Sequence, residues 1–129
     1  MQRTPPRSDQ GQRGSVTAEA ALTLPVVMAV VLVVAWALSL GVAEIRAVDA
    51  ARDGARQAAR GDDPAAVREA AERTAPSGSR IQLHRDGDMV AVTVSVVAHA
   101  PRWLLVPLPP VHLSSTSTVE VEGDESPNT

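Results

Sequence analysis

The chain has no cysteine, lysine, phenylalanine or tyrosine, and its 129 residues include only two tryptophans, Trp36 and Trp103. Without cysteine it cannot form a disulfide or a cysteine-based zinc site. With so few aromatic anchors, its apolar content is almost entirely alanine, valine and leucine, which disfavours a deep pocket for a small-molecule substrate. The formal net charge of -3 argues against a protein that binds nucleic acid.

The side chains that most often carry chemistry are scattered along the sequence. His84, His99 and His112 fall on separate predicted strands or loops, without the three- or four-residue spacing of a local metal site. The serines of residues 114–117 lack the context of a nucleophile elbow, and no glycine-rich phosphate-binding loop is present. The sequence therefore predicts no catalytic, cofactor or metal site, and we expect the protein not to be an enzyme.

A run of 24 uncharged residues, AALTLPVVMAVVLVVAWALSLGVA, lies between Glu19 and Glu44. As a helix that rises about 1.5 Å per residue, it is long enough to cross the hydrocarbon layer of roughly 30 Å. The alternative is a buried core helix, but the rest of the chain is too short to cover a helix that is apolar all round. We therefore expect a membrane span at about residues 20–43.

A secretory signal peptide is a second alternative for this run. Three arginines precede it, and Gly41-Val42-Ala43 supplies small residues for a cleavage after Ala43 that would release a secreted binding domain. However, the run exceeds the roughly 7–15 residues of an ordinary signal-peptide core. The arginines on its two sides do not decide the orientation of the span by themselves.

Directly before the run stands RGSVTAE, in which Gly14 is followed five residues later by Glu19. A basic leader, this spacing and an apolar helix together resemble the cleavage site of type IV prepilins. The stretch from EAALTLPVVM to VDAARDGARQAARG, with Leu24-Pro25 early in the span, resembles more narrowly the TadE family of tight-adherence (Flp-type) pilus proteins. The resemblance covers roughly residues 13–61. Ser15 departs from the Phe or Met that many type IV pilins carry as the first mature residue.

The resemblance implies that a prepilin peptidase, active on the cytoplasmic side of the membrane, removes a leader of residues 1–14 by cutting between Gly14 and Ser15. Glu19 then becomes the fifth residue of the mature chain. A carboxylate at the edge of an apolar helix is costly to bury and needs a positive partner, which the terminal amine of a neighbouring subunit offers. The alternative is that Glu19 merely suits the dipole of the first helical turn.

Small residues recur beyond the span. Alanines at four-residue spacing form one face, along which another backbone could pack closely. These are Ala43, Ala47, Ala51, Ala55 and Ala59. Helix breakers first appear at Gly61, so we expect one long helix over residues 15–61.

The remaining residues predict a small domain over 62–122. Asp63 as an N-cap and Pro64 at the first helical position predict a short helix, PAAVREAAERT. Two alternating runs around Asp86-Gly87 predict a hairpin, with Ile81 and Leu83 facing the same core as the valines of residues 90–96. A third alternating run, VHLSSTSTVEVE, follows the proline-rich loop APRWLLVPLPP, and we expect residues 123–129 to form a disordered tail.

The sequence thus predicts an α+β protein in which a long N-terminal transmembrane helix extends outside the membrane and is followed by a short helix and a small antiparallel β-sheet. The resemblance implies a minor pilin or pseudopilin that lies once through the cytoplasmic membrane, with its N-terminus cytoplasmic and its domain extracytoplasmic. Its partners would be the membrane, a prepilin peptidase, other pilin-like subunits and the pilus machinery. The alternative is an unprocessed single-span protein whose outer domain binds a partner.

Overall fold

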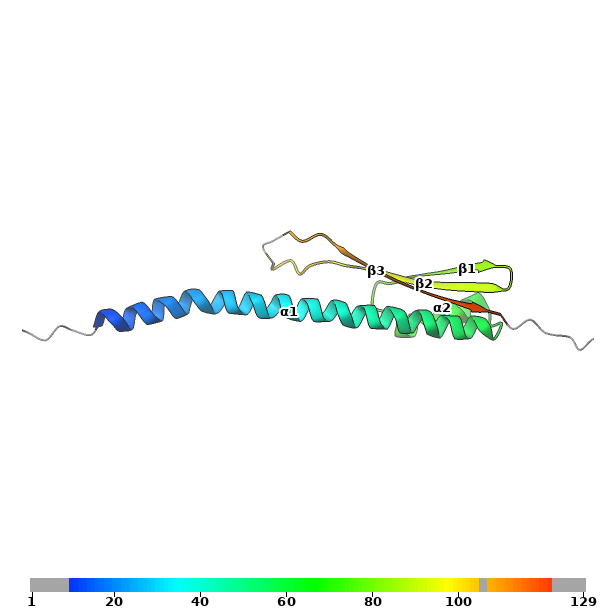
Figure 1. The fold of residues 1–129 in the computed structure, drawn as a ribbon, viewed down its shortest axis with the longest axis horizontal. Helices are drawn as coiled ribbons and strands as arrows, with labels where there is room; N and C mark the ends of the chain where they lie inside the picture. The colour runs from blue at the N-terminus through cyan, green and yellow to red at the C-terminus, as the bar shows by residue number, and fades with distance from the viewer. Residues whose placement is uncertain (1–9, 105–106, 122–129) are drawn as a thin grey trace, which may run out of the picture. The chain divides into compact units, whose positions relative to one another are not determined.

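The computed structural model describes residues 10–104 and 107–121 (Figure 1). Over these residues the chain forms two helices and then three strands, which confirms the predicted α+β class. They are α1 (Gln10–Ala59), α2 (Pro64–Thr74), β1 (Arg80–Asp86), β2 (Met89–Ala98) and β3 (Val111–Glu120). The predicted tail, residues 123–129, and most of the predicted leader, residues 1–9, lie outside the described residues.

The chain divides into two compact units, Met1–Ala37 and Leu38–Thr129. In the first unit, α1 begins at Gln10, within the predicted leader of residues 1–14 and before the predicted start of the helix at Ser15. Among the described residues, one helix is long and apolar enough to cross a membrane, and the part of it that passes this test begins at Val16. None of its most apolar window is buried within the chain, so its valines and leucines are available to lipid or to other helices.

In the second unit, α1 ends where the glycine signal predicts. Gly61 adopts a positive φ of 75°, a conformation that glycine takes without steric cost. Its N–H donates to the carbonyl of Ala58 at 3.0 Å, and the N–H of Asp62 donates to the carbonyl of Gln57 at 3.3 Å. These two hydrogen bonds form a Schellman motif, which satisfies the last carbonyls of the helix.

The short helix α2 starts at Pro64 as predicted, and its last residue is Thr74. Asp63 occupies the N-cap position with an extended backbone, but its side chain makes no capping hydrogen bond, which differs from the usual role of an N-cap aspartate. Instead, its carbonyl oxygen accepts a hydrogen bond from the N–H of Val67 at 3.1 Å.

The strands form an antiparallel sheet in the order β1-β2-β3. The predicted hairpin is confirmed: Asp86 pairs with Met89, and Gly87 has a φ of 58° while Asp88 has no positive φ, as in a type II′ turn. Ile81 is buried and Leu83 packs against the same core. The four even-numbered valines of β2, residues 90–96, are buried as well, so the predicted inner face of the hairpin is confirmed.

One core joins the two helices to the sheet. It is built from small side chains of α1, from Val67 and Ala71 of α2, and from Ile81 and the valines of the sheet. Gly54 lies where these elements meet: a Cβ atom placed there would be 2.9 Å from Val92 Cγ1 and 3.3 Å from the Cβ of Ala71. The absence of a side chain at Gly54 therefore lets the sheet and α2 approach α1 closely.

Candidate functional site

The residues of the predicted processing site lie near the N-terminal end of α1. Gly14 is exposed, and apart from its chain neighbours and the backbone of its own helix no described atom lies within 4 Å of a Cβ placed on it. Glu19 is also exposed, and no ion pair joins it to a side chain that the structure describes. Its carbonyl oxygen accepts a hydrogen bond from the hydroxyl of Thr23 at 2.8 Å. Gly14 and Glu19 are therefore both exposed on α1.

The predicted alanine face is largely used inside the chain. Ala47, Ala51 and Ala55 are each 1% exposed and belong to the core that α1 shares with α2 and the sheet. Ala43 and Ala59, at the two ends of the row, remain partly exposed. The close packing that small residues permit is thus made with the chain's own elements at the middle three positions.

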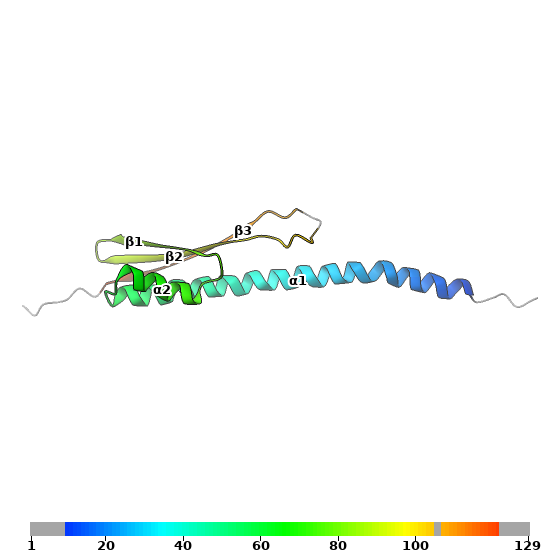
Figure 2. The same cartoon turned by 180° about the vertical axis from the view of Figure 1, so that it is seen from behind.

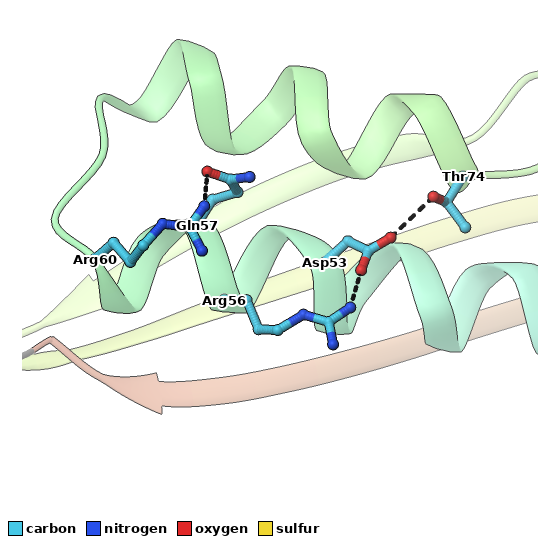
Figure 3. A network of polar contacts seen from close by, with 5 residues as sticks. All are labelled: Asp53, Arg56, Gln57, Arg60 and Thr74. Carbon is cyan, nitrogen blue, oxygen red and sulfur yellow. Dashed lines mark hydrogen bonds and ion pairs between the residues drawn. The ribbon is translucent and has the colours of Figure 1, made fainter.

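A polar network on the outer side of α1 ties it to α2 (Figure 3). The carboxylate of Asp53 accepts a hydrogen bond from the hydroxyl of Thr74 at 3.0 Å and one from the guanidinium of Arg56. One turn further along the helix, Arg60 donates to the side-chain oxygen of Gln57. The bonds from Arg56 and Thr74 hold the pKa of Asp53 below its ordinary value, and the smaller effect of burial acts in the opposite direction.

A hollow of about 360 Å³ lies where the turn after α1 faces the β1–β2 hairpin. Its floor is apolar, with Val67, Leu83 and Val90 among its lining residues. Arg68 and Arg85 also line it, and the guanidinium of Arg68 donates to the carbonyl of Ile81 at 3.3 Å. Alternation alone marked Leu83 and Val90 for the core, and it gave no signal that the two arginines would share a hollow with them.

The histidines do not converge. His84, His99 and His112 are all exposed, and they lie on β1, on the loop after β2 and on β3. Within residues 10–104 and 107–121, no group of three His, Asp or Glu side chains could hold a metal ion. In the same part of the chain, no charged or polar residue is buried. The features left to explain are therefore the predicted processing site, the apolar run and the surfaces of the sheet and α2.

Comparisons with known proteins match the chain to a family model and to a protein of Mycobacterium tuberculosis. Residues 14–56 match the family model of TadE-like proteins, for which no enzymatic activity is known. Over 77 residues the chain is 38% identical to the apoptosis inhibitor Rv3655c of Mycobacterium tuberculosis. That alignment covers 60% of this chain and 61% of the relative, so the chain spans about three fifths of the relative's length. No solved structure matches the chain.

The matched segment includes the features from which the resemblance was recognised. It starts at Gly14, contains Glu19 and the whole apolar run, and ends at Arg56 in the part of α1 that packs against the sheet. In the part of the chain that the structure describes, one apolar helix near the N-terminus is long enough for a membrane anchor, and the match includes its apolar run. The resemblance to TadE-like proteins is therefore confirmed over residues 14–56.

Proposed function

We propose that this protein is a minor pilin or pseudopilin of a tight-adherence (Flp-type) pilus, or of a related secretion filament, and acts in filament assembly. The observation that carries the proposal is the TadE-like match, which begins at Gly14 and includes the whole span. The protein crosses the cytoplasmic membrane once, with its N-terminus cytoplasmic and the domain after the span extracytoplasmic. Its role is structural, and its partners are other pilin-like subunits and the assembly machinery.

Processing by a prepilin peptidase between Gly14 and Ser15 is the first step of this proposal. Two observations support it. Gly14 is the first residue of the TadE-like match, and it is exposed near the N-terminal end of α1 with free space around its Cα atom. Helix termini fray more readily than helix interiors, so a peptidase can take this segment in an extended form without unfolding the span.

Glu19 then serves to pair subunits. After the cut, it is the fifth residue of a chain that begins with a free amine at Ser15. Its exposed carboxylate adjoins a run without any opposite charge, so burial between subunits is costly unless a cation meets it. The terminal amine of a neighbouring subunit supplies that cation and fixes the register between the two helices.

Contacts between subunits run along the exposed part of α1. Because Ala47, Ala51 and Ala55 already pack against the sheet and α2, we place the close approach of a neighbouring helix at Ala43 and at the span before it. Ala59, at the far end of the row, is partly exposed and offers a second, smaller contact.

A charge substitution with a matched control tests this role. Glu19→Ala should leave membrane insertion intact, measured as resistance to carbonate extraction, but should abolish recovery of the protein in sheared filaments. Glu44→Ala is the control, because Glu44 is also an exposed glutamate and borders the other end of the same apolar run. If the Glu19→Ala variant assembles as well as the Glu44→Ala variant, Glu19 has no part in subunit pairing.

A further inference from the structure

The loop between β2 and β3 carries exposed apolar side chains and a cation. Trp103 is 49% exposed and Leu108 is 39% exposed, although both are large apolar residues. Arg102 is exposed beside them. The loop lies at the end of the sheet opposite to the β1–β2 turn (Figures 1 and 2). We refer to Arg102, Trp103 and Leu108 as the loop cluster.

The packing of β2 on α1 shows which part of the helix this loop lies beside. Val92 lies opposite Gly54, while Val90 shares the hollow near the end of α1 with Ala58 and Gly61. As residue numbers rise along β2, the strand therefore runs back toward lower numbers of α1. Strand β2 therefore leads from the C-terminal end of α1 toward the end of the apolar run.

The distance covered by β2 places its last residue near the end of the apolar run. From Val92 to Ala98, six residues at about 3.3 Å each cover about 20 Å. The same 20 Å along α1, at about 1.5 Å per residue, leads back about 13 residues from Gly54, to the neighbourhood of Gly41. If β2 is tilted against α1, the distance that it covers along the helix axis is shorter by the cosine of the tilt angle. The last residue of β2 then lies beside a residue of α1 closer to Ala43. The loop cluster continues past Ala98, so it lies at the level where α1 enters the membrane.

The charges of the sheet are sorted along the same direction. No acidic residue occurs between Met89 and Val119, whereas Asp88 and Glu120 lie together at the β1–β2 turn, since Met89 pairs with Glu120. Arg102 lies on the loop at the other end of the sheet, within this stretch that has no acidic residue. The end with the loop cluster is thus positive and apolar, whereas the far end carries Asp86, Asp88 and Glu120 with only Arg85 beside them and is acidic on balance.

We propose that the loop cluster docks on the surface of the bilayer that α1 spans. Trp103 and Leu108 insert at the level of the lipid headgroups, where tryptophan is enriched in membrane proteins, and Arg102 contacts the phosphates of anionic lipids. The outer domain then has two attachments to the membrane, the span and the loop cluster, which together fix its orientation on the bilayer. The inference rests on the insertion of α1 and is independent of the role in filament assembly.

The two tryptophans of the chain allow a direct test in the full-length protein. Trp36→Leu leaves Trp103 as the single fluorophore, and the variant is reconstituted in phosphatidylcholine vesicles with or without phosphatidylglycerol. Phospholipids brominated at shallow or deep acyl positions and aqueous iodide are the two quenchers. The matched control is Met89→Trp combined with Trp36→Leu and Trp103→Ala, which moves the fluorophore to an exposed site at the acidic end of the sheet.

The expected result is a blue shift of Trp103 emission in vesicles, strong quenching by shallow bromines and weak quenching by iodide, with the reverse for the Met89→Trp control. Arg102→Gln should weaken docking on vesicles with phosphatidylglycerol by about five-fold, the effect of one charge near an anionic surface. Iodide quenching of Trp103 equal to that of the control would overturn the proposal. A Trp103→Ala variant, in which Trp36 is the single fluorophore, tests separately whether α1 inserts. Phospholipids brominated at deep positions quench Trp36 only if the span is in the bilayer.

Discussion

Gly54 is the position where we expect a single added methyl group to weaken the outer domain. In Gly54→Ala the new Cβ would lie 2.9 Å from Val92 Cγ1, closer than van der Waals contact, and 3.6 Å from the carbonyl oxygen of Val67. Val92 is fully buried and branched at Cβ, so it has little freedom to move away. Overpacking of this kind costs about 1–3 kcal/mol. The better helix propensity of alanine returns about 1 kcal/mol.

We therefore expect a net loss of about 1–2 kcal/mol in the free energy of unfolding of the outer domain, since the neighbours of Gly54 are too constrained for the lower limit of overpacking to apply. The assay is hydrogen exchange of the β2 amides, followed by mass spectrometry in the full-length protein. A loss of this size should speed their exchange about 5- to 30-fold.

Two further variants make the test specific. Gly41→Ala is the control, because no atom lies within 4 Å of a Cβ placed at Gly41, and it should leave β2 exchange unchanged. Combining Gly54→Ala with Val92→Ala should cost less than the sum of the two single changes, because the removed methyl groups leave room for the added one. If Gly54→Ala exchanges as slowly as the unchanged protein, the close approach at Gly54 has been misjudged.

Two smaller predictions concern pH and the hairpin turn. The pKa of Asp53 is lowered in the folded chain, first by the hydrogen bond from Arg56 and then by the one from Thr74. The ionised carboxylate therefore stabilises the folded chain above the ordinary carboxylate pKa of about 3.9, and this stabilisation is lost as the pH falls through the pKa of the folded chain. Asp53→Asn should therefore flatten the fall in melting temperature between about pH 5 and pH 2, and an unchanged slope would refute this role. At the turn, Gly87 has a φ of 58°, so Gly87→Ala should cost about 1–2 kcal/mol in a denaturation experiment, whereas Gly87→Asn should cost less. Equal losses in the two variants would show that the backbone conformation is not the cause.

The periodicities of the sequence were sufficient for the elements of the fold. The uncharged run, the glycine at position 61, Pro64 and the Asp86-Gly87 dipeptide each act locally, within a few residues of the element they begin or end. Alternation in residues 80–96 likewise identified the inner face, because the two-residue period of a strand fixes which side chains lie together.

The sequence could not show which surface packs against the alanine face of α1. The four-residue spacing of the alanines showed that Ala47, Ala51 and Ala55 share one side of α1. It could not distinguish a neighbouring subunit from the chain's own α2 and sheet, because either provides the same apolar contact. The bond between Asp53 and Thr74 was equally out of reach, since it joins residues 21 positions apart through the angle between two helices.

The mature N-terminus is the measurement that tests the proposed processing and assembly most directly. It can be determined by intact mass or N-terminal sequencing of the protein from cells with and without prepilin peptidase activity. We predict a chain that starts at Ser15 only when the peptidase is active. A chain that starts at Met1 in both strains would contradict this prediction and indicate an unprocessed single-span protein, and a start at Glu44 would indicate a secreted domain.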